Sequence, residues 1–505
     1  MSYFVLPAIF LLLNIYLLIV LFYNKKSPKY LNPKHLLIGL IAVFSLIQIC
    51  TGLAWMLFNH NYIQQFGDTA EYLNLSKSMK FDEYRMILYP LFLVMCEKTG
   101  AIFGISQTGM IYFIQTIISF FSFFYFSYVF LHAFLRRISN NTKNLKPILF
   151  YSTVFYISLF LVTIPVVTQY NLAILVDSLS LSFIVISLTA MTDVLFLGKS
   201  RLFNYVIIGI SMLLQFQLRI ERKYVFILLL FFFFLYLYKS VKTFSEAFKR
   251  VLPFVIILIV ALSANTIINK QIQQPGLYNR PLISPKSQLL FLPLWPNFEL
   301  CYDDFPEEFK NTFTIEEMKN VDQNANLMIY GIYPKLADLF GAEKANDLIF
   351  SCDVAIIKNY PDRLITRAAY NVIQYILSPL QIVFNINGIT AGASEWNFSR
   401  MYEATPAMTT FYYKSSLYMF IILLITSIAS AIKICKKAFS PCLSLLSPLL
   451  TVCVAISMVF GLLNASPANY RYLLIGHVFW YMLMVVSIFC IIEVNEKPTD
   501  KSLQG

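Results

Sequence analysis

The chain has 505 residues, of which 58% are hydrophobic and only 13% carry a charged side chain. About a quarter of the residues of a soluble domain are charged, so this composition excludes an ordinary soluble enzyme and predicts an all-α integral membrane protein. A net charge of +12 on a soluble chain would suggest nucleic-acid binding. Here we attribute it to Lys and Arg in loops beside the membrane, and we expect no nucleic-acid partner.

Eleven apolar stretches predict membrane-spanning helices, because a helix of about 20 residues crosses a hydrocarbon core about 30 Å thick. Only helices and closed barrels cross lipid with every backbone polar group hydrogen-bonded. In chain order the stretches are 3–23, 35–58, 109–134, 147–165, 172–197, 202–217, 224–238, 251–268, 413–432, 440–463 and 470–492. The pair 202–217 and 224–238 is short and 172–197 is long, so the ends of these three are the least defined.

The distribution of Lys and Arg predicts the orientation. One set of alternate short loops holds more than twice as many of these residues as the other set, and cytoplasmic loops are the ones that accumulate them. The C-terminus is therefore expected inside the cell. Stretch 3–23 has no basic residue before it and Lys25 and Lys26 after it, which is the wrong order for a cleaved signal peptide. We expect a retained anchor and a multi-pass protein of the cytoplasmic membrane.

Two long segments, 59–108 and 269–412, fall on the outer side. The second carries 15 of the 27 acidic residues and predicts a small soluble domain with helices near 314–328 and 343–359. The chain then divides into an N-terminal transmembrane module, 1–268, an extracytoplasmic loop domain, 269–412, and C-terminal transmembrane helices with a cytoplasmic tail, 413–505.

The stretch 361–385 combines arginines with aliphatic residues. It begins with Pro361, a favourable first helical residue, and places Arg363 and Arg367 among Leu and Ile side chains. This composition predicts a helix that lies on the membrane surface.

The first outer loop contains the first candidate site. Asp68, Glu71 and Tyr72 are spaced three and four residues apart, so they share one face of a helix. Arg85 and the pair Tyr89-Pro90 follow where the chain returns to an apolar environment.

Charged residues at the outer ends of later helices extend this site. Asp177 lies inside the apolar stretch 172–197, where a carboxylate is costly and by default suggests a function. Arg219 and Arg222 lie in a basic turn between two short apolar stretches, and planar guanidinium groups suit phosphate oxygens. Arg471-Tyr472 begins the last stretch.

No HExxH, CxxC, Walker or GxGxxG motif occurs in the sequence, and the four histidines are scattered. A histidine-rich zinc site and ATP-driven work are therefore unsupported.

These motifs, in this order, resemble the GT-C class of polytopic glycosyltransferases, such as protein mannosyltransferases and aminoarabinose transferases. The resemblance rests on Asp68 followed by Tyr72, Arg85 with Tyr89-Pro90, Asp177-Ser178, and Arg471-Tyr472. The chain departs from the pattern at Ile87, where many relatives have proline, and segment 269–412 matches no pattern of the class.

The resemblance implies an inverting transfer of a sugar from a polyprenyl-phosphate carrier to a glycan, lipid or protein outside the membrane. It assigns Asp68 as the catalytic base, and Glu71 or Asp177 as a positioning residue or as a ligand of Mg²⁺ or Mn²⁺. The expected donor-binding residues are Arg85, Arg219, Arg222, Arg471, Tyr72 and Tyr89.

Other interpretations stay open at this stage. A polysaccharide polymerase or ligase that uses pyrophosphate-linked glycans would also need outer arginines. A lipid or sugar transporter, which is no enzyme, typically has paired halves, and the sequence has no internal repeat. The acidic residues could be solvated loop residues, and the basic turn could simply anchor in lipid headgroups.

Overall fold

The computed structural model describes residues 33–59, 67–81, 85–138, 147–197, 202–274, 297–324, 327–376, 406–436, 443–463 and 470–493. Within these ranges every regular element is a helix, apart from isolated bridge residues such as the parallel pair Phe81 and Gln273. The prediction of an all-helical chain is therefore confirmed for the described residues. The predicted stretch 3–23 lies outside them.

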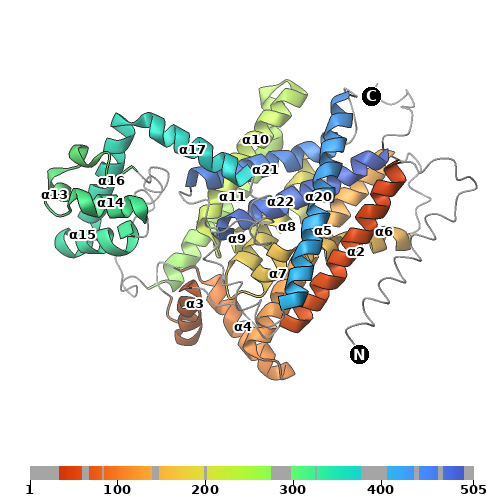
Figure 1. Cartoon of the computed structure of the whole chain (residues 1–505), viewed down its shortest axis with the longest axis horizontal. Coiled ribbons are helices and arrows are strands. Elements are labelled where there is room, and N and C mark those ends of the chain that lie inside the picture. Colours follow the sequence, from red (N-terminus) through yellow and green to blue (C-terminus); the bar gives the residue numbers. More distant parts are fainter. Residues whose placement is uncertain are drawn as a thin grey trace, which may run out of the picture.

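The helices of the main bundle follow most of the predicted stretches (Figure 1). They are α2 (Pro33–Asn59), α3 (Gly67–Ser78), α4 (Leu88–Phe103), α5 (Gln107–Ile138), α6 (Pro147–Val162), α7 (Pro165–Asn171), α8 (Asp177–Phe196), α9 (Leu202–Phe216), η2 (Ile220–Arg222), α10 (Lys223–Val241), α11 (Phe244–Ile272), α20 (Pro406–Lys436), α21 (Leu443–Leu463) and α22 (Tyr470–Glu493).

Five of the described helices, in α2, α5, α8, α11 and α20, are long and apolar enough to cross a membrane, and the bent pair α6–α7 makes a sixth if it is one span. Shorter apolar helices lie in α9, α21 and α22. The chain thus has the long apolar helices of an α-helical membrane protein.

The helix ends differ from the sequence prediction around residue 165. Helix α6 ends at Val162, and α7 starts at Pro165 after a bend of 74°. Ile164 is extended, with φ −64° and ψ 132°, because the ring of a following proline disfavours the helical conformation. Helix α8 then starts only at Asp177, so 172–176 is not helical. The sequence did not predict this break, because residues 172–176 are as apolar as the helices on either side.

One large apolar core holds the main bundle together. Helix α5 packs against α6 and α8, α2 against α20, and α21 against α22. Side chains such as Trp55, Phe130, Leu229 and Tyr481 are almost fully buried in this core. A second, smaller core lies under α3 and α4 and includes Tyr72 and Tyr89. It carries the site described below.

Residues 297–376 form a separate group of short helices beside the bundle (Figure 1). They are η3 (Tyr302–Asp304), α13 (Glu307–Lys310), α14 (Ile315–Gln323), η4 (Met328–Ile332), α15 (Tyr333–Phe340), α16 (Ala342–Asn359) and α17 (Pro361–Ile376). The predicted helices near 314–328 and 343–359 correspond to α14 and α16. These short helices enclose their own buried core, which includes Phe309, Met318 and Ile349.

Helix α17 connects this group to the bundle, where it packs along α21. The part of the predicted surface helix beyond residue 376 lies outside the described residues. At the other end of the segment, α11 continues to Ile272, past the expected boundary at 268.

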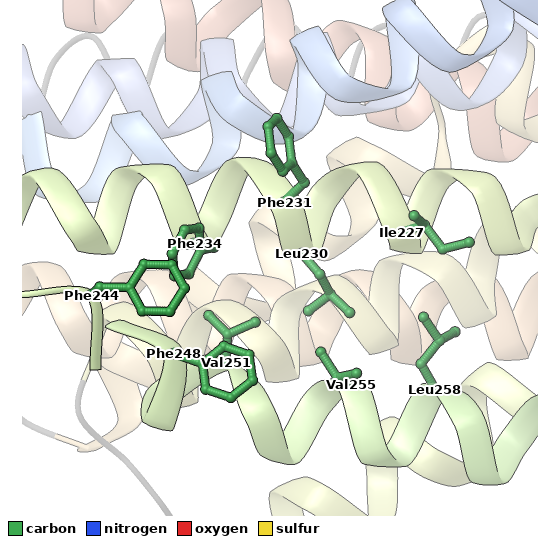
Figure 2. Close-up of a pocket in the computed structure, with 9 residues that line it drawn as sticks. All are labelled: Ile227, Leu230, Phe231, Phe234, Phe244, Phe248, Val251, Val255 and Leu258. Atoms are coloured by element: carbon green, nitrogen blue, oxygen red, sulfur yellow. The ribbon is translucent and has the colours of Figure 1, made fainter. Parts of the chain in front are cut away.

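An apolar groove of about 400 Å³ runs between α10 and α11 (Figure 2). Its lining includes Ile227 near the start of α10 and Phe244 and Phe248 at the start of α11. Because the lining is almost entirely hydrocarbon, the groove suits a lipid chain better than a sugar.

Candidate functional site

Helix α3 presents the acidic residues of the first outer loop. Asp68, Glu71 and Tyr72 lie on it as the spacing predicted, and all three contact Arg85. The Thr69 hydroxyl donates a hydrogen bond of 3.0 Å to the carbonyl oxygen of Ile174. This bond fixes α3 against the non-helical segment that leads to Asp177.

Arg85 binds two carboxylates at once. Its Nη2 atom lies 2.8 Å from Asp68 Oδ1 and 2.6 Å from Glu71 Oε2, and its guanidinium carbon lies 5.1 Å from the centre of the Tyr72 ring. The Arg85 side chain is only 13% exposed. Arg85 thus holds the two carboxylates of α3 close together.

Asp177 and Arg219 form a second ion pair. Arg219 Nη2 donates to Asp177 Oδ1 at 2.9 Å and to Oδ2 at 3.1 Å. The Asp177 side chain is 2% exposed, and a carboxylate buried so deeply in an apolar bundle needs a cation close by. The pair joins the first turn of α8 to the turn between α9 and η2.

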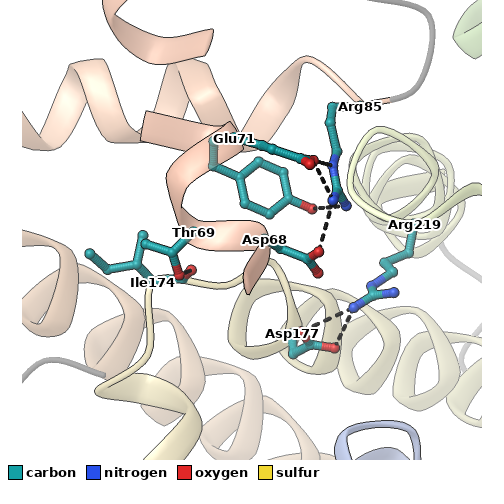
Figure 3. Close-up of polar contacts among 8 residues, drawn as sticks. Asp68, Thr69, Glu71, Arg85, Ile174, Asp177 and Arg219 are labelled. Carbon is teal, nitrogen blue, oxygen red and sulfur yellow. Dashed lines mark hydrogen bonds and ion pairs between the residues drawn. The ribbon is translucent and has the colours of Figure 1, made fainter. Parts of the chain in front are cut away.

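The two ion-paired groups lie on neighbouring elements, and Asp68 and Arg219 point into the space between them (Figure 3). We call Asp68, Glu71, Arg85, Asp177 and Arg219 the carboxylate–arginine site. The structure therefore brings together five residues from three separate parts of the sequence, which the motifs had suggested one by one.

A layer of polar side chains lies beneath this site, and one of them, Gln115, was not predicted from the sequence. The rings of Tyr72 and Tyr89 meet edge to face, with centroids 5.0 Å apart. Tyr89 donates a hydrogen bond to Gln115, 3.3 Å away. The Gln115 amide in turn donates to the carbonyl oxygens of Asn171 and Ala173 at 2.9 and 3.1 Å. Gln115 thus links the layer under α3 to the segment that carries Asp177.

The last turn of α11 holds the segment around Arg85. Gln273 donates a side-chain hydrogen bond of 3.2 Å to the Arg85 carbonyl oxygen, and the Gln274 N–H donates to the Phe81 carbonyl oxygen at 2.9 Å. From the turn after α9, the Gln217 amide donates to Asn265 and Asn269 of α11 at 2.9 and 3.1 Å. Glutamine and asparagine inside apolar stretches were a usable sequence signal, because uncharged polar residues there need partners.

The remaining predicted site residues lie outside this constellation. Tyr89 is fully buried beneath Tyr72, and Arg222 is 1% exposed within η2, so neither presents its side chain to a bound molecule here. Arg471 begins α22, but its side chain is outside the described residues. Among the side chains that the structure describes, no three His, Cys, Asp or Glu residues lie close enough to hold a metal ion.

No protein family, curated protein or solved structure matches this chain. The resemblance to GT-C glycosyltransferases therefore stays a prediction from the motifs.

Proposed function

We propose that this protein is a membrane-embedded, inverting glycosyltransferase that moves a sugar from a polyprenyl-phosphate carrier to a cell-envelope acceptor on the extracytoplasmic side. The observation that carries the proposal is the carboxylate–arginine site. It combines a carboxylate that can accept a proton, Asp68, with a guanidinium that can bind a phosphate, Arg219, at one end of an apolar helix bundle.

In the proposed reaction Asp68 takes the proton of the acceptor hydroxyl. The acceptor oxygen attacks the anomeric carbon and forms the new C–O bond, while the bond from that carbon to the phosphate oxygen breaks. The phosphate leaves with the electron pair, and Arg219 stabilises its added charge. Arg85 and Glu71 hold Asp68 in place, and Asp177 orients Arg219 through its two hydrogen bonds.

The proposed topology has eleven membrane spans, with the C-terminus inside and the segments 59–108 and 269–412 outside. It is supported by the contacts of α3 with Ile174 and of Phe81 with α11, because the charge count assigns all these segments to the outer side. The apolar groove between α10 and α11 starts at Ile227, about one helical turn after Arg222. A lipid tail in this groove would keep its phosphate near the basic turn.

One observation favours transport as a second candidate function. The bend between α6 and α7 and the non-helical segment 172–176 make a discontinuous helix beside the site, and transporters build substrate sites from discontinuous helices. In proteoliposomes, movement of the lipid-linked sugar across the membrane without formation of a glycosylated acceptor would favour transport over glycosyl transfer.

The decisive experiment measures sugar transfer by purified protein from radiolabelled polyprenyl-phosphate sugars to an envelope extract. Loss of an essential general base typically costs a factor of about 10² to 10⁴. We therefore expect Asp68→Asn to lower kcat by that factor while the protein still binds the donor. Normal turnover by Asp68→Asn would exclude Asp68 as the base.

Glu246→Gln serves as the matched control. Glu246 is also paired with an arginine, Arg250, but in an exposed pair of α11. It should retain wild-type kcat. A wild-type protein that neither binds nor consumes any carrier-linked monophosphate sugar would contradict the proposal itself, and pyrophosphate-linked glycans would then be the next donors to test.

A further inference from the structure

The exposed side of α17 is unusually apolar. Ile365 is 68% exposed and Ile373 is 53% exposed, and the exposed Ala369 lies between them. These three residues follow one another at intervals of four, so they form a stripe along one side of the helix. A continuous apolar stripe of this kind marks a contact surface more often than a solvated one.

The preceding helix in the same group of helices shows what a solvated face looks like here. The side chains that α16 exposes are mostly charged or polar, among them Glu343, Lys344, Asp347, Ser351 and Lys358. Its apolar residues, including Leu348 and Ile349, are buried in the core. The two helices are joined at Tyr360, so the apolar exposed face begins where the chain turns toward the bundle.

Tyr370 borders the stripe, whereas Arg363 and Arg367 lie toward the other side of α17, each two residues before a stripe residue. The Arg363 side chain is 53% exposed, and the guanidinium of Arg367 stands over the ring of Tyr370, 5.5 Å from its centre. Tyr370 is itself 46% exposed. Amphipathic arginine and tyrosine side chains are typical of the zone between lipid headgroups and acyl chains.

The neighbour of α17 indicates what covers the stripe. On its other side α17 packs along α21, an apolar helix without a charged residue that leaves Leu450 46% exposed. The stripe therefore lies beside a helix that itself exposes an apolar side chain. Phospholipid acyl chains would cover the isoleucines, and Tyr370 at the edge of the stripe would lie at the depth of the headgroups.

We propose that the face of α17 formed by Ile365, Ala369 and Ile373 lies against phospholipid, so that α17 anchors helices η3–α16 to the bilayer. This inference is independent of the proposed sugar transfer, because it rests on the exposure of one helix and on its neighbour.

Collision measurements on nitroxide labels test the proposal in the full-length protein. A genetically encoded ketone side chain carries the label, so the native cysteines stay in place. Labels replace Ile365 and Ile373 in the stripe and Ser351 of α16 as the solvated control. The protein is placed in nanodiscs of phosphatidylethanolamine and phosphatidylglycerol, and oxygen and a water-soluble nickel chelate serve as collision partners.

Because oxygen concentrates in lipid and the chelate stays in water, we expect the ratio of oxygen to chelate collisions to be several-fold higher at 365 and 373 than at 351. An equal ratio at all three sites would place the stripe in water and overturn the proposal. Low collision rates with both reagents at 365 and 373 would also overturn it, since protein would then cover the stripe, either another segment of this chain or a second copy.

Discussion

The ion pair between Asp177 and Arg219 invites a test that separates folding from catalysis. Asp177 is almost fully buried, and removal of one partner from a buried pair costs about 3–5 kcal/mol because it leaves a charge in an apolar site. Arg219→Gln and Asp177→Asn should therefore each lower the thermal unfolding temperature of the detergent-solubilised protein. The double variant should regain much of that loss, because both charges are gone.

Sugar transfer by the same double variant then distinguishes the two roles of Arg219. If Arg219 stabilises the leaving phosphate, transfer stays low even though the fold is restored, and kcat falls by about 10²-fold or more. Transfer that recovers together with stability would show that the pair only holds α8 and α9 together.

Asp353 should make the stability of helices η3–α17 depend on pH. It lies in the core of this group, and neither carboxyl oxygen has a hydrogen-bond partner among the described residues. Burial raises the pKa of Asp353 to about 9 from 3.8. Between these two values the folded form keeps a proton that the unfolded form releases. The free energy of unfolding therefore falls as pH rises, by up to about 1.4 kcal/mol per pH unit.

Asp353→Asn removes this proton linkage while it keeps the size of the side chain. The variant should be more stable than wild type at neutral pH, and its advantage should grow between pH 6 and pH 8 in thermal unfolding experiments. The contribution of other groups cancels in the difference between the two proteins. An advantage that stays constant between pH 6 and pH 8 would mean that Asp353 is already ionised in the folded protein.

At the scale of single residues, the sequence indicated the charged members of the site but not their partners. Asp68 and Glu71 were recognisable from their spacing on one helix face, and Arg85 from its place before Tyr89-Pro90. Asp177 was recognisable because a carboxylate inside an apolar stretch is costly. The sequence did not reveal that Arg85 forms ion pairs with two carboxylates or that Tyr89 is fully buried. Gln115 was missed because its importance depends on backbone atoms of residues 171 and 173, which lie far away in the sequence.

At the scale of helices, close packing of α2 depends on a glycine. A Cβ atom at Gly52 would lie 2.8 Å from Thr163 Cβ and 3.1 Å from Tyr412 Cε2, whereas a Cβ atom at Gly39 in the same helix would meet nothing within 4 Å. Gly52→Ala should therefore destabilise the protein by about 1–3 kcal/mol through overpacking. Gly39→Ala should be neutral or slightly stabilising, because alanine favours the helix. Thermal unfolding of the two variants compares them directly, and equal unfolding temperatures would contradict the tight contact at Gly52.

The positions of the helices were largely predictable, since length and hydropathy locate an apolar segment well. The break between α6 and α8 was not, because residues 172–176 are as apolar as a helix and fully buried. Only Pro165 gave a local sign of it, and proline alone does not distinguish a kink from the end of a helix. The outcome depended on hydrogen bonds from Thr69 and Gln115, which are long-range contacts.

At the scale of the whole molecule, hydropathy predicted an apolar bundle and a more polar segment but not how they meet. The packing of α17 along α21 joins parts of the chain separated by about 80 residues, and no local pattern encodes such a pairing. The orientation of the bundle, by contrast, follows from charge bias alone, and it remains a prediction.

Short peptide tags read by antibody in intact and permeabilised cells test this orientation. A tag after Lys242, in the turn between α10 and α11, should be accessible only after permeabilisation, and a tag after Asn311 should be accessible in intact cells. Only α11 and residues 273–311 separate the two positions, so equal accessibility would contradict their placement on opposite sides of the membrane. A third tag between α21 and α22, within 464–469, should be accessible outside, and a fourth at residue 503 only after permeabilisation. If the third tag behaves like the fourth, α21 and α22 do not each cross the bilayer, and the chain has fewer than eleven spans.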